Sequence, residues 1–285
     1  YEAVNTEEEA NGIGVKFKIN DAIGNGKFGI VYKGQNLRTK EIVAIKTEKN
    51  SIYKLLKREA IIIDHLYREK VKKIPSIYWY GKYNDLTCLI MTHFQYDLMS
   101  YVEIKKPEKE KIGLLIIKCI DVLENVHNKS IIHRDIKPQN FMIKDTDIYL
   151  IDFGLALFYK DENNIHIQHK DENSIVGTPK YISFFNHNGE LQSRRDDLIS
   201  LGYMYLFLIS GSLPWDYIHQ MEYKTDLQEI SLDHPKNILR CEKKEFNNLR
   251  EHCDEDLLKY LDYCYSLNFD DDPDYDKLMS FFTFV

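Results

Sequence analysis

A change in hydrophobic periodicity near residue 94 is the feature that most limits the folds open to this chain. Before it, apolar side chains alternate with polar ones, which predicts β-strands; the segments are residues 15–19, 30–32, 42–46 and 87–91. After it, apolar side chains recur every three or four positions, as in residues 112–126, which predicts helices. We therefore expect an α+β fold of two lobes with a ligand cleft at their junction. The expected parts are an acidic flexible tail at residues 1–15, a small β-rich lobe with one helix at 16–94, and a larger, mainly helical lobe at 95–285.

The composition argues against several classes of function. The 285 residues include 38 Lys and Arg and 45 Asp and Glu, and the net charge of −7 comes without a long basic block, which argues against nucleic acid as a partner. Five scattered cysteines predict neither a disulfide framework nor a zinc site. The longest apolar stretch, residues 198–209, is shorter than the roughly 20 residues that cross a bilayer. We expect an intracellular, mainly cytoplasmic monomer that acts on proteins and has no membrane association.

Two charged residues occupy positions where an apolar side chain is expected. Lys46 ends the strand pattern of residues 42–46, and Glu59 lies on the apolar stripe of a helix that we expect to begin near its N-cap, Ser51. The stripe consists of Ile52, Leu55, Leu56, Ile62, Ile63 and Leu66. Because an unpaired buried charge is costly, we expect Lys46 and Glu59 to be each other's partner.

A glycine-rich stretch separates the first two predicted strands. Its residues are Gly24, Asn25, Gly26, Lys27, Phe28 and Gly29, which match the G-x-G-x-x-G pattern. The pattern alone also fits a dinucleotide site or an ordinary turn. In a dinucleotide site, however, the loop opens a helix, whereas here residues 30–34 continue as a strand. We therefore expect the tip of a hairpin that folds over phosphates.

The densest group of candidate catalytic residues is the sequence His-Arg-Asp-Ile-Lys-Pro-Gln-Asn that begins at His133. Asp135 is expected to accept the proton of an attacking hydroxyl, Lys137 to neutralise charge on a transferring phosphoryl group, and Asn140 to bind a magnesium ion. Asp152, in an Asp-Phe-Gly sequence after a predicted strand, supplies a second oxygen ligand for Mg²⁺. We interpret His133 as a packing residue that supports this loop and not as a base.

Together with Val-Ala-Ile-Lys at residues 43–46, these motifs resemble the eukaryotic protein kinase superfamily over about residues 17–284. Four later segments resemble the casein kinase 1 family: residues 177–183, 192–198, 211–215 and 269–275. The resemblance implies the bilobal protein kinase fold and a serine/threonine protein kinase. Such an enzyme transfers the γ-phosphate of ATP, with Mg²⁺, to serine or threonine hydroxyls of protein substrates.

The resemblance also implies roles for individual residues. Lys46, held by Glu59, would contact the α- and β-phosphates, Thr178 would contact Asp135 and Lys137, and Asp197 would brace the catalytic loop. The residues expected around adenine are Ile23, Val31, Ala44, Met142 and Ile151, with Met91 as the gatekeeper and Thr92, His93 and Phe94 as the hinge.

The chain departs from the family where casein kinase 1 enzymes resemble one another in a basic pocket that reads a phosphate upstream of the target. Lys180 stands in place of an arginine, Asn173 in place of a lysine, and residues 220–226, Gln-Met-Glu-Tyr-Lys-Thr-Asp, in place of a Lys/Arg cluster that also resembles a nuclear-targeting patch. We expect a weaker preference for phosphate-primed substrates and less nuclear retention. Because the family is active without loop phosphorylation, we also expect constitutive activity.

Two alternatives give different expectations for the same residues. A pseudokinase, a kinase-shaped interaction module, would be expected to lack Lys46, Asp135, Asn140 or Asp152, and all four are present. A small-molecule phosphotransferase of this architecture would lack the Gly-Thr-Pro-Lys-Tyr sequence of residues 177–181, which is also present.

Overall fold

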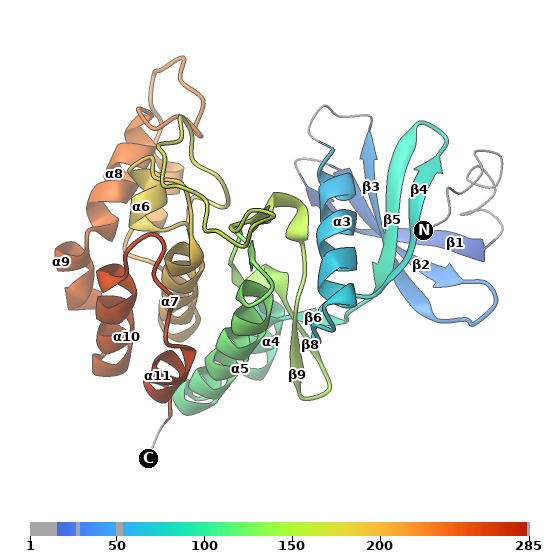
Figure 1. Ribbon diagram of the computed structural model, residues 1–285, viewed down its shortest axis with the longest axis horizontal. Helices are drawn as coiled ribbons and strands as arrows, with labels where there is room; N and C mark the ends of the chain where they lie inside the picture. Colours follow the sequence, from blue (N-terminus) through green and yellow to red (C-terminus); the bar gives the residue numbers. More distant parts are fainter. Residues whose placement is uncertain (1–15, 27–28, 50–53, 284–285) are drawn as a thin grey trace. The chain divides into compact units, whose positions relative to one another are not determined.

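The computed structural model of the chain (Figure 1) describes residues 16–26, 29–49 and 54–283, which form two compact units. The first unit comprises the chain up to Gln95 together with Ile151–Gly154, and the second comprises Tyr96–Leu150 and the chain from Leu155. Residues 151–154 thus belong to the β-rich unit although they follow it by more than fifty residues in sequence. The predicted tail, and Lys27 and Phe28 of the glycine-rich stretch, lie outside the described residues.

The first unit is an antiparallel sheet with one helix. Its strands are β1 (Phe17–Gly26), β2 (Gly29–Asn36), β3 (Ile42–Lys49), β4 (Ile77–Tyr83) and β5 (Leu86–Thr92), in the order β1-β2-β3-β5-β4. Helix α3 (Leu55–Arg68) follows β3. It buries Leu56, Glu59, Ile62, Ile63 and Leu66, which includes most of the predicted stripe.

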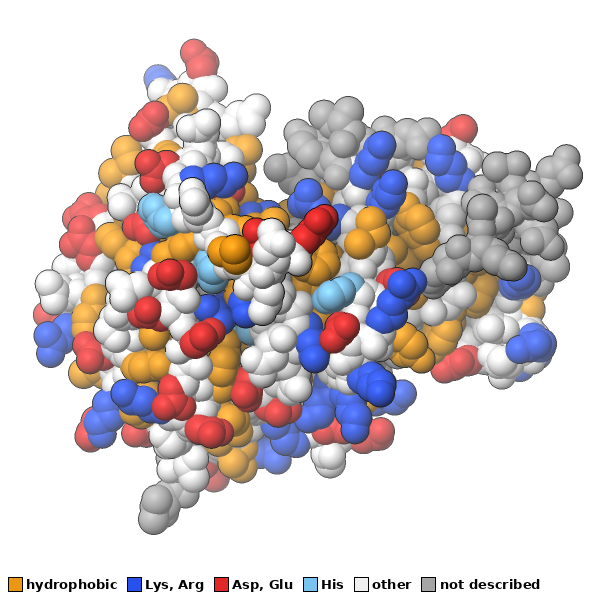
Figure 2. Space-filling model, in the orientation of Figure 1, with side chains coloured by type: hydrophobic (Ala, Val, Ile, Leu, Met, Phe, Trp, Pro, Cys, Tyr) orange, Lys and Arg blue, Asp and Glu red, His pale blue; other side chains and the backbone are white. Residues whose placement is uncertain are grey.

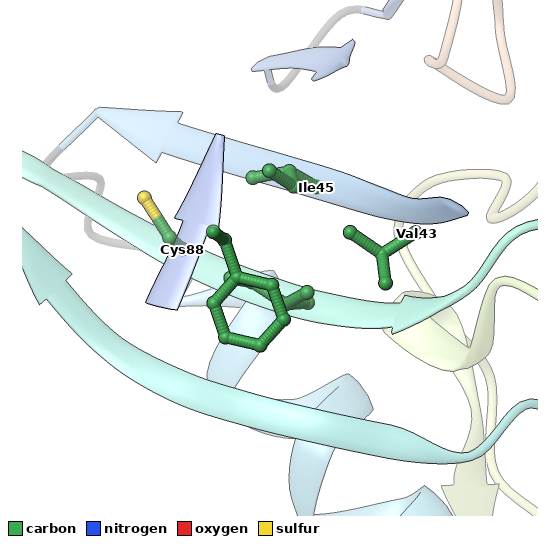
Figure 3. Close-up of a cluster of buried hydrophobic side chains, with 5 residues drawn as sticks. Val43, Ile45 and Cys88 are labelled. Carbon is green, nitrogen blue, oxygen red and sulfur yellow. The ribbon is translucent and has the colours of Figure 1, made fainter. Parts of the chain in front are cut away.

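The side chains of β3 and β5 alternate between the two faces of this sheet, as the period of a strand requires. Val43, Ile45, Cys88 and Ile90 form one buried cluster with Phe17 (Figure 3). On the opposite face Leu89 and Met91 pack with Leu56 of α3, and Ala44 packs against them. Lys46, two residues after Ala44, therefore points to the face that α3 covers.

The start of α3 differs from the sequence prediction. The helix begins at Leu55, later than the predicted N-cap Ser51 implies, and Ser51 itself lies outside the described residues. Lys54, the residue before the helix, forms no side-chain cap. Instead the carboxylate of Glu48 in β3 accepts hydrogen bonds from the N–H groups of Leu55 and Leu56, at 3.2 and 3.3 Å. A negative charge at a helix N-terminus satisfies free amides and opposes the helix dipole favourably.

The second unit is mainly helical. Its helices are α4 (Leu98–Lys105), α5 (Lys109–His127), α6 (Phe184–His187), α7 (Arg194–Ser210), α8 (Pro235–Lys244), α9 (Phe246–Leu249), α10 (Glu255–Ser266) and α11 (Tyr275–Ser280), with short 3₁₀ turns at Pro138–Asn140 and Asp216–Gln220. Its strands form two small antiparallel sheets: β6 (Tyr96–Asp97), β8 (Phe141–Lys144) and β9 (Asp147–Leu150) in one, β7 (Ile131–Ile132) and β10 (Leu157–Phe158) in the other.

Helix α7 forms the centre of this unit: it is buried along nearly its whole length and contains the longest apolar stretch of the sequence, residues 198–209. It contacts α5 and α10, and Gly202 permits tight packing against α10, because a Cβ atom there would be 2.6 Å from the side chain of Leu261. A capping box starts the helix: Ser193 and Asp196 exchange side-chain and backbone hydrogen bonds. Gly211, with φ of 77°, ends it in the left-handed conformation that glycine adopts without strain.

Three further observations concern the surface, the hydrophobicity of the helices and the cysteines. On the face shown in Figure 2, acidic and basic side chains are interspersed. No helix in the described part of the chain is long and apolar enough to span a membrane. All five cysteines are free; Cys88, Cys119 and Cys264 are buried, and Cys241 and Cys253 are half-buried.

Candidate active site

The predicted ion pair between Lys46 and Glu59 is confirmed in the first unit. Lys46 Nζ lies 2.7 Å from Glu59 Oε1 and 2.9 Å from Asp152 Oδ1, and the side chain of Glu59 is only 1% exposed. Burial alone would lower the pKa of Lys46, but the carboxylates of Asp152 and Glu59 together raise it above its ordinary value. The lysine therefore keeps its positive charge on the face of the sheet that α3 covers.

The glycine-rich stretch forms the end of a hairpin, as predicted. β1 and β2 are antiparallel, and their pairing runs to Gly26 opposite Gly29. At Gly29 a Cβ atom would lie 1.7 Å from the carbonyl oxygen of Thr47 in β3, so no larger residue fits this backbone. Gly24 is different, because a Cβ atom there would make only ordinary contact with Val31 at 3.7 Å.

The residues predicted around adenine are distributed over both units. In the first unit these predicted residues are neighbours across adjacent strands. Val31 in β2 pairs with Gly24 in β1 and with Lys46 in β3, and Ala44 in β3 pairs with Met91 in β5. Ile23 is exposed and Met91 is buried. Thr92, the last residue of β5, and His93 and Phe94, which follow it, are half-buried. Ile151 belongs to the first unit, whereas Met142, in β8, belongs to the second. Contact of this set with a nucleotide stays a prediction.

The catalytic loop of the second unit runs from β7 to β8 and is held by Asp197. The carboxylate of Asp197 accepts hydrogen bonds from the backbone N–H groups of His133 and Arg134, at 2.6 and 2.8 Å, which confirms the predicted brace. Burial would raise the pKa of Asp197, but the hydrogen bond from His127 Nε2 at 3.0 Å and the loop amides hold it below its ordinary value. His133 is fully buried, and its Nδ1 accepts the N–H of Asp135, as expected for a supporting residue.

The bond between His127 and Asp197 extends to the last helix of the chain. His127 lies at the end of α5, and its Nδ1 is 2.6 Å from the hydroxyl of Tyr275 in α11. Burial lowers the pKa of His127 and so favours the neutral ring with one N–H. That proton goes to Asp197, and Nδ1 accepts from the tyrosine hydroxyl. The periodicity of the sequence did not reveal this connection.

Three predicted residues converge around Asp135. Lys137 Nζ donates to Asp135 Oδ2 at 2.6 Å, and the Thr178 hydroxyl donates to Asp135 Oδ1 at 2.6 Å. Lys137 also lies 3.1 Å from Thr178 Oγ1, and Asn140 Nδ2 donates to the backbone oxygen of Asp135 at 2.7 Å. The predicted contacts of Thr178 are thereby confirmed. Asp135 is 7% exposed, so its orientation is fixed from both carboxylate oxygens.

The two predicted magnesium ligands have the chemistry that the ion requires. The amide nitrogen of Asn140 points toward Asp135, so the side-chain oxygen of Asn140 is available as a ligand for a cation. The carboxylate of Asp152 accepts a hydrogen bond from Lys46 Nζ. Its backbone φ is 69°, and its side chain is 43% exposed. Amide and carboxylate oxygens are ligands that a hard cation prefers. Asn140 belongs to the second unit and Asp152 to the first.

Beyond Thr178, a lysine that the sequence did not reveal holds the next residues in place. Lys244, at the end of α8, is fully buried and donates to the carbonyl oxygens of Pro179 and Ile182, at 2.9 and 2.7 Å. Its third partner, at 3.0 Å, is Nε2 of His187. Asn237 donates both amide hydrogens to carbonyl groups, so its oxygen accepts from His187 Nδ1 and leaves Nε2 as an acceptor. Burial and Arg240 lower the pKa of Lys244 well below its ordinary value.

The residue that replaces the arginine of the family's basic pocket is already paired. Lys180 Nζ lies 2.8 Å from Asp216 Oδ2 and 3.8 Å from the centre of the Phe207 ring. Its backbone oxygen accepts the indole N–H of Trp215 at 2.8 Å. The ammonium group of Lys180 therefore has a carboxylate and an aromatic face as neighbours.

Residues 17–280 match the family model described as a protein kinase domain. The chain belongs to the protein kinase family. This membership confirms the bilobal kinase fold predicted from the sequence, a β-sheet unit with one helix followed by a helical unit.

The chain is also similar to three casein kinase I homologs of Schizosaccharomyces pombe, which confirms the predicted resemblance to the casein kinase 1 family. It is 32% identical to homolog 3 over 97% of its length and 63% of that protein, and 32% identical to homolog 1 over 96% of its length and 62% of that protein. Identity to homolog 2 is 31%, over 95% and 62%. The chain thus spans less than two-thirds of the length of the curated relatives it matches.

Proposed function

We propose that the chain is an active serine/threonine protein kinase of the casein kinase 1 type, which transfers the γ-phosphate of ATP to protein hydroxyls. The observation that carries this proposal is the convergence of Lys137, Thr178 and Asn140 on Asp135, with three contacts between 2.6 and 2.7 Å. A pseudokinase has no need for a carboxylate held from both oxygens beside an ammonium group, so this geometry favours catalysis over an interaction module.

In this reaction each residue has a role that follows from its contacts. Asp135 accepts the proton of the substrate hydroxyl and orients its oxygen, while Lys137 offsets the negative charge on the phosphoryl group in transit. Lys46, kept charged by Glu59, binds nucleotide phosphates. Asn140 and Asp152 would hold Mg²⁺, which supplies charge neutralisation on the phosphates when bound. Thr178 fixes the rotamer of Asp135 through its hydroxyl.

The test of catalysis is the Asp135→Asn variant, compared with Asp262→Asn, which removes an exposed carboxylate from α10. We expect phosphate transfer to casein-like peptides to fall about 10²- to 10⁴-fold in Asp135→Asn, the usual loss for a general base, with nucleotide affinity retained. Asp262→Asn should behave as the wild type. Wild-type protein that binds nucleotide but phosphorylates no protein or peptide would favour the pseudokinase.

We further propose that the enzyme is constitutively active. The segment after Asp-Phe-Gly is supported by backbone pairing, because Asp171 pairs with Glu190 and Ser174 with Ser231. The hydroxyl of Thr178 is already bonded to Asp135 and so serves structure instead of regulation. Protein produced in bacteria with a co-expressed phosphatase should therefore be active, and recovery of activity only after phosphorylation would contradict the proposal.

The third part of the proposal is a reduced preference for phosphate-primed substrates. Its support is that Lys180 is paired with Asp216, that Asn173 carries no charge, and that residues 220–226 contain two acidic residues and one lysine. A peptide with phosphoserine three residues before the target and its unphosphorylated counterpart test this directly. Similar kcat/KM values for the two peptides are expected, and a large gain from the phosphate would refute it.

A further inference from the structure

Arg134, the residue before Asp135, is held at several points. Its backbone N–H donates to Asp197 at 2.8 Å, and its side-chain Nε donates to the carbonyl oxygen of Leu155 at 2.8 Å. Its φ of 67° lies in the left-handed region, which costs energy for a residue with a Cβ atom. Because the conformation of Arg134 sets the direction in which Asp135 leaves the backbone, groups that hold Arg134 also position Asp135.

A carboxylate from the segment after Asp-Phe-Gly lies beside this arginine. Glu172 Oε1 is 3.9 Å from Arg134 Nη1, and the two side chains are 20% and 9% exposed. The other oxygen, Glu172 Oε2, is buried and has no hydrogen-bond partner among the described residues. A carboxylate in such surroundings needs a positive charge nearby, and Arg134 supplies it.

Backbone hydrogen bonds, and not side-chain contacts of Glu172, hold its segment in this position. The N–H of Glu172 donates to the carbonyl oxygen of Gly189 at 2.7 Å, and the N–H of Leu191 donates to Lys170 at 3.0 Å. Gly189 has a φ of 88°, and a Cβ atom there would approach Leu232 at 2.8 Å, so the pairing depends on glycine. The neighbouring Asp171 is exposed, which makes it a natural control.

Kinase activation loops are often ordered when a phosphate on the loop pairs with an arginine. We propose that Glu172 takes the place of that phosphate in this chain: its carboxylate neutralises Arg134 permanently and thereby keeps the catalytic loop in its working conformation. Glu172 is thus a positioning residue for Asp135. The proposal deepens the proposed kinase function and rests on it, and it gives constitutive activity a specific cause.

The first experiment compares the kcat of full-length wild type, Glu172→Gln and Asp171→Asn on one peptide substrate. Both variants lose one negative charge at neighbouring positions, but only the first removes the charge of the carboxylate beside Arg134. We expect Glu172→Gln to lower kcat about tenfold, with the KM for ATP unchanged, because a charge-assisted contact that positions the base is lost. Asp171→Asn should retain wild-type kcat. Equal kcat values for wild type and Glu172→Gln would overturn the proposal.

The second experiment separates charge from general damage to the fold. A Glu172→Ser variant is prepared once with a free hydroxyl and once with phosphoserine incorporated at this position, each verified by mass spectrometry. The phosphorylated form should regain most of the wild-type kcat, whereas the unmodified form should stay about tenfold slower. If the two forms have the same kcat, Glu172 does not replace a phosphate, even if Glu172→Gln is impaired through instability.

Failure of the underlying function gives a different result. In that case the wild type, Asp171→Asn and the phosphoserine form would all lack peptide phosphorylation, and both proposals would fall together. If the wild type is active and only the Glu172 comparisons show no difference, the kinase proposal stands and the role of Glu172 is refuted.

Discussion

Freeing Lys180 from Asp216 should increase the response of this enzyme to a phosphate on its substrate. The Asp216→Asn variant removes the charge of the carboxylate whose Oδ2 lies 2.8 Å from Lys180 Nζ. The same oxygen accepts the N–H of Leu213 at 2.9 Å, and an asparagine oxygen can retain that bond. The substitution therefore changes the partner of Lys180 with little change in shape.

The size of the effect follows from the pair's geometry and exposure. The two side chains are 30% and 29% exposed, so solvent screens the interaction strongly. At 2.8 Å the attraction between unit charges is about 1.5 kcal/mol at the dielectric constant of water, and measured exposed pairs contribute up to about 1 kcal/mol. A free ammonium group should recover this energy from a substrate phosphate, which corresponds to roughly a five- to tenfold gain.

The assay is the ratio of kcat/KM for the phosphoserine-primed peptide to that for the unprimed peptide. This ratio should rise about five- to tenfold in Asp216→Asn and should decline again in high salt, which screens the new contact. Asp233→Asn, which removes an exposed carboxylate from the connection before α8, controls for net charge and should leave the ratio unchanged. An unchanged ratio in Asp216→Asn would refute the argument that internal pairing occupies Lys180.

Three further predictions concern buried titratable side chains. Glu59→Gln should lower the free energy of unfolding by about 3 kcal/mol in urea denaturation, the lower end for a broken buried pair, because Lys46 retains Asp152. Lys244→Met should raise the KM for peptide about tenfold while the KM for ATP stays unchanged, since its loss frees the carbonyl groups that follow Thr178. Burial raises the pKa of Asp196 to about 6, so its carboxylate binds a proton more tightly in the folded state than in the unfolded chain. This group therefore reduces stability as pH rises from about 4 to 6, by up to about 3 kcal/mol. Asp196→Asn should remove that decrease, and equal pH profiles of unfolding for variant and wild type would contradict it.

Charged residues that interrupt an apolar sequence pattern were the most predictable part of the site. Lys46 and Glu59 each interrupt an apolar pattern, and the cost of an unpaired buried charge was enough to predict their contact. The hairpin at the glycine-rich stretch was also predictable, because the residues directly after Gly29 continue as a strand. Thr178 and Asp197 were assigned by resemblance to a family, and their contacts agree with that assignment.

The residues that the sequence did not reveal lie on helix faces that are buried although their side chains are polar. The buried face of α8 consists of Asn237, Arg240 and Lys244, while Ile238 on the same helix is 55% exposed. A search for apolar periodicity points to the wrong face of such a helix, because its partners are carbonyl groups contributed by distant residues. The start of α3 shows a related effect: among the described residues, the first two amides of the helix donate to Glu48, which belongs to the preceding strand.

The hydrogen bonds from Tyr275 through His127 to Asp197 have a practical consequence for shortened versions of the chain. A truncation that removes α11 leaves the glycine-rich, His-Arg-Asp and Asp-Phe-Gly motifs intact, yet it takes away the hydroxyl that occupies Nδ1 of His127. The ring is then free to change its tautomer, and Asp197 can lose one of its donors. Expression limits chosen from these three motifs alone would therefore yield a protein with its catalytic residues present and an unsupported catalytic loop.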